Sequence, residues 1–210
     1  MFKRSFMIRL SGVVLRQQFG VGAGAGAGAT TPLRTASRPI STRATRFTLN
    51  TKAQIPAIGY GTFQDADAQE EGVSRALKMG MRLIDTARVY DVEKQVGKGI
   101  KDSGVPREDI FLATKLWCNS YHPDDVEKGL DESLADLNTP YVDLLLMHYP
   151  CTFARGNERF PRDAQGRMVH GQTTFVDTWK AMEELLGTGK VKAIGVSNFS
   201  KGESETLLKE

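Results

Sequence analysis

The feature that most constrains this chain is an alternation of short apolar runs with longer amphipathic segments, from about residue 57 onward. The short runs have the length and composition of strands, and the segments between them have helical spacing. The run 142–147 is apolar throughout, as expected of a strand covered on both faces. Such an alternation predicts βα units, a parallel sheet with right-handed crossovers, and therefore an α/β fold class.

The alternation predicts five strands and five helices after an N-terminal β-hairpin whose turn contains Asn50 and Thr51. The strands are predicted to end near Gly61, Asp85, Thr114, Met147 and Val196. The helices are predicted at 68–79, around Val96 and Ile100, at 123–137, at 175–186 and after Ser200. The connection 149–173 is long for a segment without an element of its own, which indicates a functional lid.

Residues 1–45 differ from the rest of the chain because they are rich in Arg, Ser and Thr and lack acids. Four of their apolar residues share one helical face: Phe2, Phe6, Leu10 and Val13. This composition is typical of a mitochondrial transit peptide, with a disordered tail or a mispredicted start site as alternatives. The repeat GAGAGAGA at 22–29 predicts a flexible joint. We therefore expect a disordered segment over 1–45, a domain over 46–210 and a mitochondrial location, with the cytoplasm as the alternative.

The net charge of +3 is unevenly distributed along the chain. Residues 65–210 hold 19 basic and 25 acidic side chains, a balance of −6, so no nucleic-acid partner is expected. No apolar run approaches the ~20 residues needed to cross a bilayer, and no membrane partner is expected either. Two cysteines, Cys118 and Cys151, form no disulfide framework and suit a reducing compartment.

Polar side chains stand at the ends of several predicted strands. They are Asp85 with Tyr90 shortly after it, Lys115, His148, and the pair Ser197 and Asn198. Because the carboxyl ends of parallel strands meet at one edge, where ligands bind, we expect these side chains to share a pocket. The small residues Gly61 and Thr62 at the end of the first strand would let a ligand approach the backbone.

These residue types fit acid-assisted hydride transfer. A phenol is a weak acid, and a nearby ammonium favours its ionised form. Lys115, held by Asp85, would supply that charge, so Tyr90 is predicted to donate a proton. His148 is expected to hydrogen-bond the carbonyl oxygen that is being reduced.

Each of these residues also has an alternative interpretation. Asp85 could cap a turn, Lys115 could be a solvated strand end, His148 could cap a strand and Tyr90 could pack in the core. Tyr90 and Lys94 also match the Tyr-x-x-x-Lys pair of short-chain dehydrogenases, but the glycine-rich loop and upstream Ser of that class are missing. The histidines lack metal-ligand spacing, so no metal is predicted. They are His122, His148 and His170.

Five segments resemble the aldo-keto reductases in their order and spacing, over about residues 46–210. They are IPAIGYGTF, RLIDTARVY, ATKLW, VDLLLMHYP and VKAIGVSNF. The stretch around FARGNERFPRDAQGR is most similar to fungal members that act on glycerol, glyceraldehyde and sugar aldehydes. The resemblance implies a partial (β/α)8 TIM barrel that holds about five of the eight βα units and an N-terminal β-hairpin.

The resemblance implies a monomeric NADP-dependent oxidoreductase that uses NADPH to reduce small aldehydes or ketones to alcohols, or acts on polyols. It implies Tyr90 as proton donor, Asp85 and Lys115 as the residues that tune it, and His148 as the residue that orients the carbonyl. The expected cofactor-binding residues are Gly61, Thr62, Asp85, Ser197 and Asn198. The expected substrate-binding residues are Trp117, His148 and Tyr149.

The chain ends in the helix after the fifth predicted strand. The resemblance implies that the remaining part carries the aromatic residue that stacks on nicotinamide and a basic loop for the 2′-phosphate of NADP. An open five-stranded sheet would also leave unpaired edges on both sides. We therefore expect the 210-residue chain alone to bind NADPH poorly and to be unstable. A catalytically inactive, truncated aldo-keto reductase and a non-enzymatic cofactor-binding subunit are the alternative functions.

Overall fold

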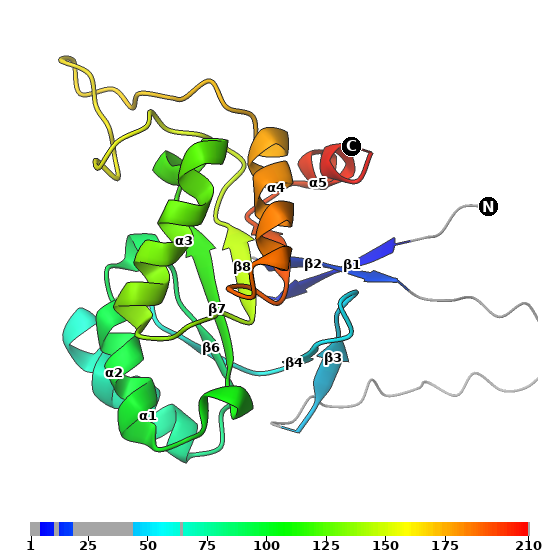
Figure 1. The fold of residues 1–210 in the computed structure, drawn as a ribbon, viewed down its shortest axis with the longest axis vertical. Coiled ribbons are helices and arrows are strands. Elements are labelled where there is room, and N and C mark those ends of the chain that lie inside the picture. The colour runs from blue at the N-terminus through cyan, green and yellow to red at the C-terminus, as the bar shows by residue number, and fades with distance from the viewer. Residues whose placement is uncertain (1–4, 11–12, 19–43, 64, 210) are drawn as a thin grey trace, which may run out of the picture.

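The computed structural model describes residues 5–10, 13–18, 44–63 and 65–209. In that part of the chain, five parallel strands alternate with five helices, as predicted (Figure 1). The strands are β5 (Tyr60–Gly61), β6 (Leu83–Asp85), β7 (Phe111–Leu116), β8 (Leu144–Met147) and β9 (Ile194–Ser197). The helices are α1 (Gln69–Lys78), α2 (Glu93–Ser103), α3 (Pro123–Leu137), α4 (Phe175–Glu184) and α5 (Lys201–Leu207). Each parallel strand pairs with the next one in chain order, so the predicted α/β arrangement of βα units is confirmed.

Side chains of the central strands alternate between the two faces of the sheet. One face packs against the helices and includes Ile84, Leu112 and Leu145. The other face forms a second cluster that includes Leu83, Phe111, Leu144 and Leu146. Because β7 and β8 are buried on both faces, their sequences do not alternate between apolar and polar residues.

A hairpin of β3 (Arg46–Thr48) and β4 (Gln54–Pro56) precedes the βα units, and its turn includes residues 50 and 51, as predicted. Leu49 and Ile55 from this hairpin join the second cluster. That cluster includes the first residues of β6 and β7, Leu83 and Phe111, so the hairpin packs near the amino ends of the strands.

Local signals set the helix ends. Ser200 and Glu203 form the predicted capping box at the start of α5. Thr174 caps α4 in the same way. Pro123 is the first residue of α3, where a missing backbone N–H has no cost. The helix predicted over 175–186 instead ends at Glu184 and tightens into a 3₁₀ turn.

The connection between β8 and α4 is as long as predicted. Its described residues, 149–173, form no helix or strand. The backbone makes isolated bridges, between Phe153 and His170 and between Arg162 and Met168, and a turn at 164–165. In Figure 1 this yellow segment extends beyond the end of the sheet toward which the arrowheads of β7 and β8 point. The loop therefore lies at the carboxyl ends of the strands, and its role as a lid stays a prediction.

Within residues 1–45 the structure describes two strands, and the disorder expected over that segment stays a prediction. β1 (Ser5–Leu10) and β2 (Val13–Gln18) form an antiparallel hairpin, and β2 pairs with the outer edge of β9. The edge of a parallel sheet carries unpaired N–H and C=O groups, and an added strand satisfies them. The expectation of unpaired edges on both sides is therefore wrong at Val196 and Ser197, where β2 pairs with β9. The Gly-Ala repeat lies outside the described residues, and mitochondrial targeting stays a prediction.

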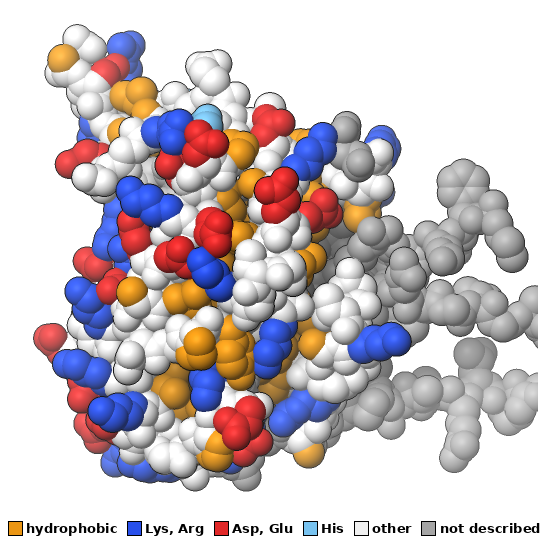
Figure 2. Space-filling model, in the orientation of Figure 1, with side chains coloured by type: hydrophobic (Ala, Val, Ile, Leu, Met, Phe, Trp, Pro, Cys, Tyr) orange, Lys and Arg blue, Asp and Glu red, His pale blue; other side chains and the backbone are white. Residues whose placement is uncertain are grey.

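Figure 2 shows acidic and basic side chains interspersed over one face of the molecule, without a large basic patch on that face. This distribution agrees with the mildly acidic balance of residues 65–210. None of the helices that the structure describes has the length and apolar character needed to span a bilayer.

Candidate active site

A pocket of about 470 Å³ lies at the carboxyl ends of the parallel strands. It brings the four predicted catalytic side chains together with Trp117, Tyr149, Ser197 and Asn198. Its lining residues are Phe63, Asp85, Val89, Tyr90, Lys115, Trp117, His148, Tyr149, Phe160, Ser197 and Asn198. The convergence expected from the strand ends is therefore observed, whereas the role of each side chain stays a prediction.

Lys115 lies within β7 rather than after it, because the strand continues to Leu116. Its side chain is only 4% exposed. Nζ donates to Asp85 Oδ1 at 2.6 Å and to the Thr86 carbonyl oxygen at 2.8 Å, and lies 3.4 Å from Tyr90 Oη. An ammonium has three N–H donors, so these three acceptors account for all of them. The ion pair with Asp85 offsets the cost of burying the lysine charge.

Tyr90 ends a 3₁₀ helix, Arg88–Tyr90, that follows β6. Because the Lys115 ammonium can only donate, Tyr90 Oη is the acceptor in their contact, and the phenol proton points elsewhere. The distance of 3.4 Å is long for a hydrogen bond. Catalytic hydrogen bonds are often long before a substrate binds, so the distance is compatible with a role in proton transfer. The phenol proton is thus available to a group bound in the pocket.

His148 follows β8 and is almost fully buried. Burial, and then the positive charge of Lys115, lower the pKa of His148 to about 3. The imidazole is therefore neutral near pH 7 and carries a single N–H donor. Its Nδ1 is buried and has no hydrogen-bond partner among the described residues. Its ring stacks on Tyr149, with a centroid separation of 5.0 Å, and meets Trp117 edge to face at 5.3 Å.

Ser197 is the last residue of β9, and Asn198 follows with a backbone φ of 60°. This left-handed conformation is less costly for Asn than for most residues. Asn198 Nδ2 donates to the His148 carbonyl oxygen at 2.9 Å and to Ser197 Oγ at 3.1 Å. These bonds fix the amide of Asn198 between the ends of β8 and β9.

Gly61 and Thr62 lie at the end of β5 but do not line the pocket. The backbone N–H and hydroxyl of the buried Thr62 both donate to the Asp85 carbonyl oxygen, at 3.0 and 3.4 Å. A Cβ added at Gly61 would meet no atom within 4 Å, so no neighbour requires glycine there. Thr62 thus holds the backbone of Asp85, and cofactor binding by Gly61 and Thr62 stays a prediction.

Aromatic side chains form one wall of the pocket. Trp117 donates its indole N–H to the Arg159 carbonyl oxygen at 2.8 Å, and its ring lies 5.4 Å from that of Phe160. The ring of Phe63 lies 5.0 Å from that of Tyr90. Sequence reasoning missed Phe63 and Phe160. Phe63 follows the first predicted strand closely enough to have been found, whereas Phe160 belongs to a loop whose path no local pattern specifies.

The residues at the end of β9 suit a nicotinamide ring. A carboxamide carries N–H donors and a carbonyl acceptor, and the Ser197 hydroxyl and Asn198 amide in the same pocket have complementary groups. Asp85 and Lys115 supply a paired charge beside them. In the part of the chain that the structure describes, no three His, Cys, Asp or Glu side chains are grouped to hold a metal ion.

The chain belongs to the aldo/keto reductase family, whose model matches residues 55–210. It is 48% identical over 161 residues to a D/L-glyceraldehyde reductase of Hypocrea jecorina, in a match that covers 73% of this chain and 48% of that protein. It is 46% identical over 167 residues to the aldo-keto reductase family 1 member A1 of Xenopus tropicalis, covering 77% of this chain and 51% of that protein.

A solved aldose reductase from Schistosoma japonicum has a similar fold, with a TM-score of 0.76 and 35% identity, over 79% of this chain and 56% of that one. The chain spans about half the length of the curated relatives it matches. The resemblance to aldo-keto reductases, including a fungal relative, and the partial barrel fold are thus confirmed.

Proposed function

We propose that this chain acts in the NADP-dependent reduction of aldehydes or ketones to alcohols, with Tyr90 as general acid. The observation that carries the proposal is the arrangement at Lys115, whose three donors are used by Asp85, Thr86 and Tyr90. Family membership supports an oxidoreductase of this class. The NADP preference follows from the family resemblance, and the name of the glyceraldehyde reductase relative supports a small aldehyde as substrate.

In this mechanism a reduced nicotinamide would supply the hydride to the carbonyl carbon, with Ser197 and Asn198 holding its carboxamide. Tyr90 donates its proton to the carbonyl oxygen. The Lys115 ammonium, fixed by Asp85, stabilises the phenolate that remains.

The neutral His148 holds and orients the substrate. Its imidazole donates its N–H to the same carbonyl oxygen and so fixes the direction from which the proton arrives. The rings of Trp117, Tyr149 and Phe160 form an aromatic wall of the pocket against which the substrate would lie.

The test is aldehyde-dependent oxidation of NADPH by the full 210-residue chain, with glyceraldehyde as substrate. NADPH is raised to millimolar concentration because weak binding is expected. Tyr90→Phe should lower kcat by about 10²- to 10⁴-fold, the usual contribution of a general acid. Tyr141→Phe is the matched control, because Tyr141 packs under Arg107 and Lys192 at the amino end of β8. A parent chain without turnover, or a Tyr90→Phe variant with an unchanged rate, would refute the proposal.

The alternatives of an inactive chain and a binding subunit make a different prediction. Either one would show no aldehyde-dependent oxidation, and a binding subunit would still quench or shift NADPH fluorescence. A pocket that combines a proton donor, a buried ammonium and a neutral imidazole favours the enzyme.

We also propose a mitochondrial location, on the composition of residues 1–45, and a monomeric state. Cell fractionation tests the mitochondrial location, and recovery of the protein in the cytoplasmic fraction would contradict it. Light scattering of the purified chain tests the monomeric state.

A further inference from the structure

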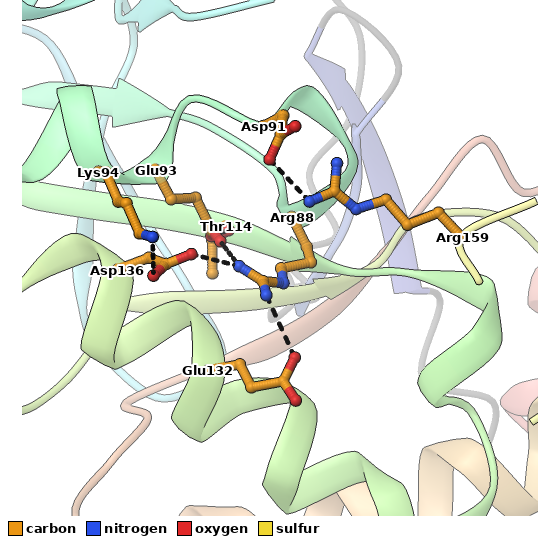
Figure 3. Close-up of polar contacts among 8 residues, drawn as sticks. All are labelled: Arg88, Asp91, Glu93, Lys94, Thr114, Glu132, Asp136 and Arg159. Carbon is orange, nitrogen blue, oxygen red and sulfur yellow. Dashed lines mark hydrogen bonds and ion pairs between the residues drawn. The ribbon is translucent and has the colours of Figure 1, made fainter. Parts of the chain in front are cut away.

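Charged side chains from α2, α3 and the loop before α4 gather around Arg88 and Asp91, which lie on either side of Tyr90 in the sequence (Figure 3). Arg88, the first residue of the turn that carries Tyr90, reaches across to α3. Its guanidinium donates to Asp136 Oδ2 at 2.5 Å and to Glu132 Oε2 at 3.2 Å. The beginning of the turn is therefore anchored to the neighbouring helix.

Glu93, the first residue of α2, anchors the other end of the turn. Its side chain is 2% exposed. Oε1 accepts from the Thr114 hydroxyl at 2.6 Å, and Oε2 lies 3.5 Å from Arg88 Nη1. Burial raises the pKa of Glu93, while hydrogen bonds from Thr114 and Ser133 and the charge of Arg88 oppose that rise. A buried carboxyl depends strongly on such partners, so the position of Glu93 follows that of Thr114.

Thr114 directly precedes Lys115 in β7, and successive side chains of a strand face opposite sides of the sheet. Lys115 faces the pocket, where it contacts Tyr90. Thr114 faces the helices, where it binds Glu93. The segment that carries Tyr90 is thus joined to β7 from both faces of the sheet, through two neighbouring residues of the same strand.

Few backbone hydrogen bonds hold this segment. The Tyr90 N–H donates to the Ala87 carbonyl oxygen at 3.0 Å. The Asp91 N–H donates to the Arg88 carbonyl oxygen at the longer distance of 3.4 Å. Asp91 then adopts a left-handed φ of 62° before α2 begins. Side-chain contacts, more than backbone pairing, therefore decide where the turn sits against β7.

We propose that Glu93 is a positioning residue for Tyr90, and that its bond to Thr114 sets the distance between the Tyr90 oxygen and the Lys115 ammonium. The kinetic part of this inference rests on the proposed function; the structural part does not. Glu93 touches no substrate and acts only through the turn.

The experiment compares Glu93→Gln and Thr114→Val with two controls. Thr114→Ser keeps the hydroxyl and should restore the parent behaviour. Asp143→Asn makes the same acid-to-amide change in a buried carboxylate paired with an arginine, at the amino end of β8. The first readout is the NMR spectrum of protein in which every tyrosine carries ¹³C at Cζ. The resonance of Tyr90 is assigned as the one that disappears in the Tyr90→Phe variant.

We expect Glu93→Gln and Thr114→Val to shift the Tyr90 resonance, and Thr114→Ser and Asp143→Asn to leave it in place. The second readout is turnover of glyceraldehyde. We expect kcat to fall about 10- to 100-fold in the first pair while the KM for the aldehyde changes little, because misplacement by about 1 Å costs rates of this order. If valine prevents folding, the Glu93→Gln variant still decides the question, because it keeps a hydrogen-bonding side chain.

An unmoved Tyr90 resonance in both variants, or an equal shift in Asp143→Asn, would overturn the positioning role. If the parent chain shows no turnover, the proposed reaction fails, and the resonance alone decides whether Glu93 positions Tyr90.

Discussion

Buried ion pairs occur at both ends of the parallel strands, and the two ends differ in how completely their polar groups are satisfied. At the amino end, Asp143 accepts from the Leu112 N–H at 3.0 Å and pairs with Arg107 at 2.9 Å and Lys192 at 3.0 Å. The carboxylate there is surrounded by donors of the protein itself. The carboxylate of Asp143 therefore needs no ligand to complete its hydrogen bonds.

At the carboxyl end, Lys115 is equally well paired, with Asp85 at 2.6 Å. Two polar groups beside Lys115 lack a partner in the part of the chain that the structure describes. The phenol proton of Tyr90 points away from Lys115, and His148 Nδ1 is buried without a hydrogen-bond partner among the described residues. Buried polar groups are nearly always satisfied in folded proteins, so each exception requires an explanation. This difference supports the proposal that the carboxyl end serves chemistry, while the amino end contributes to stability.

The largest expected effect is that of Lys115→Met on turnover. Methionine fills the same space without a charge, so the phenolate of Tyr90 would form without its stabilising ammonium. We expect kcat/KM for glyceraldehyde to fall about 10²- to 10⁴-fold. Because Asp85 is 34% exposed, water can solvate it, and stability should change less than at Asp143. Retention of the parent rate would show that the carboxyl end is structural too.

Asp143→Ala should act on stability instead. It removes the carboxylate that neutralises Arg107 and the acceptor of the buried Leu112 N–H, which should lower the free energy of unfolding by about 3 kcal/mol. Urea unfolding followed by circular dichroism measures this change. The kcat per folded molecule should stay near the parent value, and a large loss of kcat would break the division between the two ends.

The smallest expected effect is the pH dependence caused by His148. Its pKa is about 3 in the folded protein and 6.5 ordinarily, so between these values the unfolded chain binds a proton that the folded chain does not. The free energy of unfolding should therefore fall as the pH decreases from 6.5, by on the order of 2 kcal/mol at pH 5, and should recover fully above 6.5.

Urea unfolding at several pH values measures this slope. His148→Gln cannot titrate, so its stability should fall less steeply than that of the parent over the same range. Parallel curves for the two proteins would mean that His148 is not held neutral by its surroundings.

Much of the fold could be predicted because its signals are local. The capping box of Ser200 and Glu203, and Pro123 at the start of α3, depend only on residues a few positions apart. Apolar spacing identified the five parallel strands and the five helices for the same reason, but not β1 and β2. Lys115 was expected just after its strand, but β7 continues to Leu116, because its last residues pair with β8. Strand ends depend on such partners, which a local pattern does not contain.

The site was predictable to the extent that its residues stand at strand ends. Asp85 and His148 could be found in this way, and Tyr90 by its distance from Asp85. Phe160 could not, because it reaches the pocket from a long loop. The network of Arg88 and Glu93 was also missed, since its partners Asp136 and Thr114 are 48 and 21 residues away.

By itself, the sequence determined the order of the βα units, the helix caps and the identity of the candidate catalytic side chains, because these follow from the spacing of nearby residues. Only the tertiary structure decided that Lys115 uses all its donors, that His148 is neutral, and that β2 covers the edge of β9. Each of these depends on burial and on contacts between distant residues, and those exist only after the chain has packed.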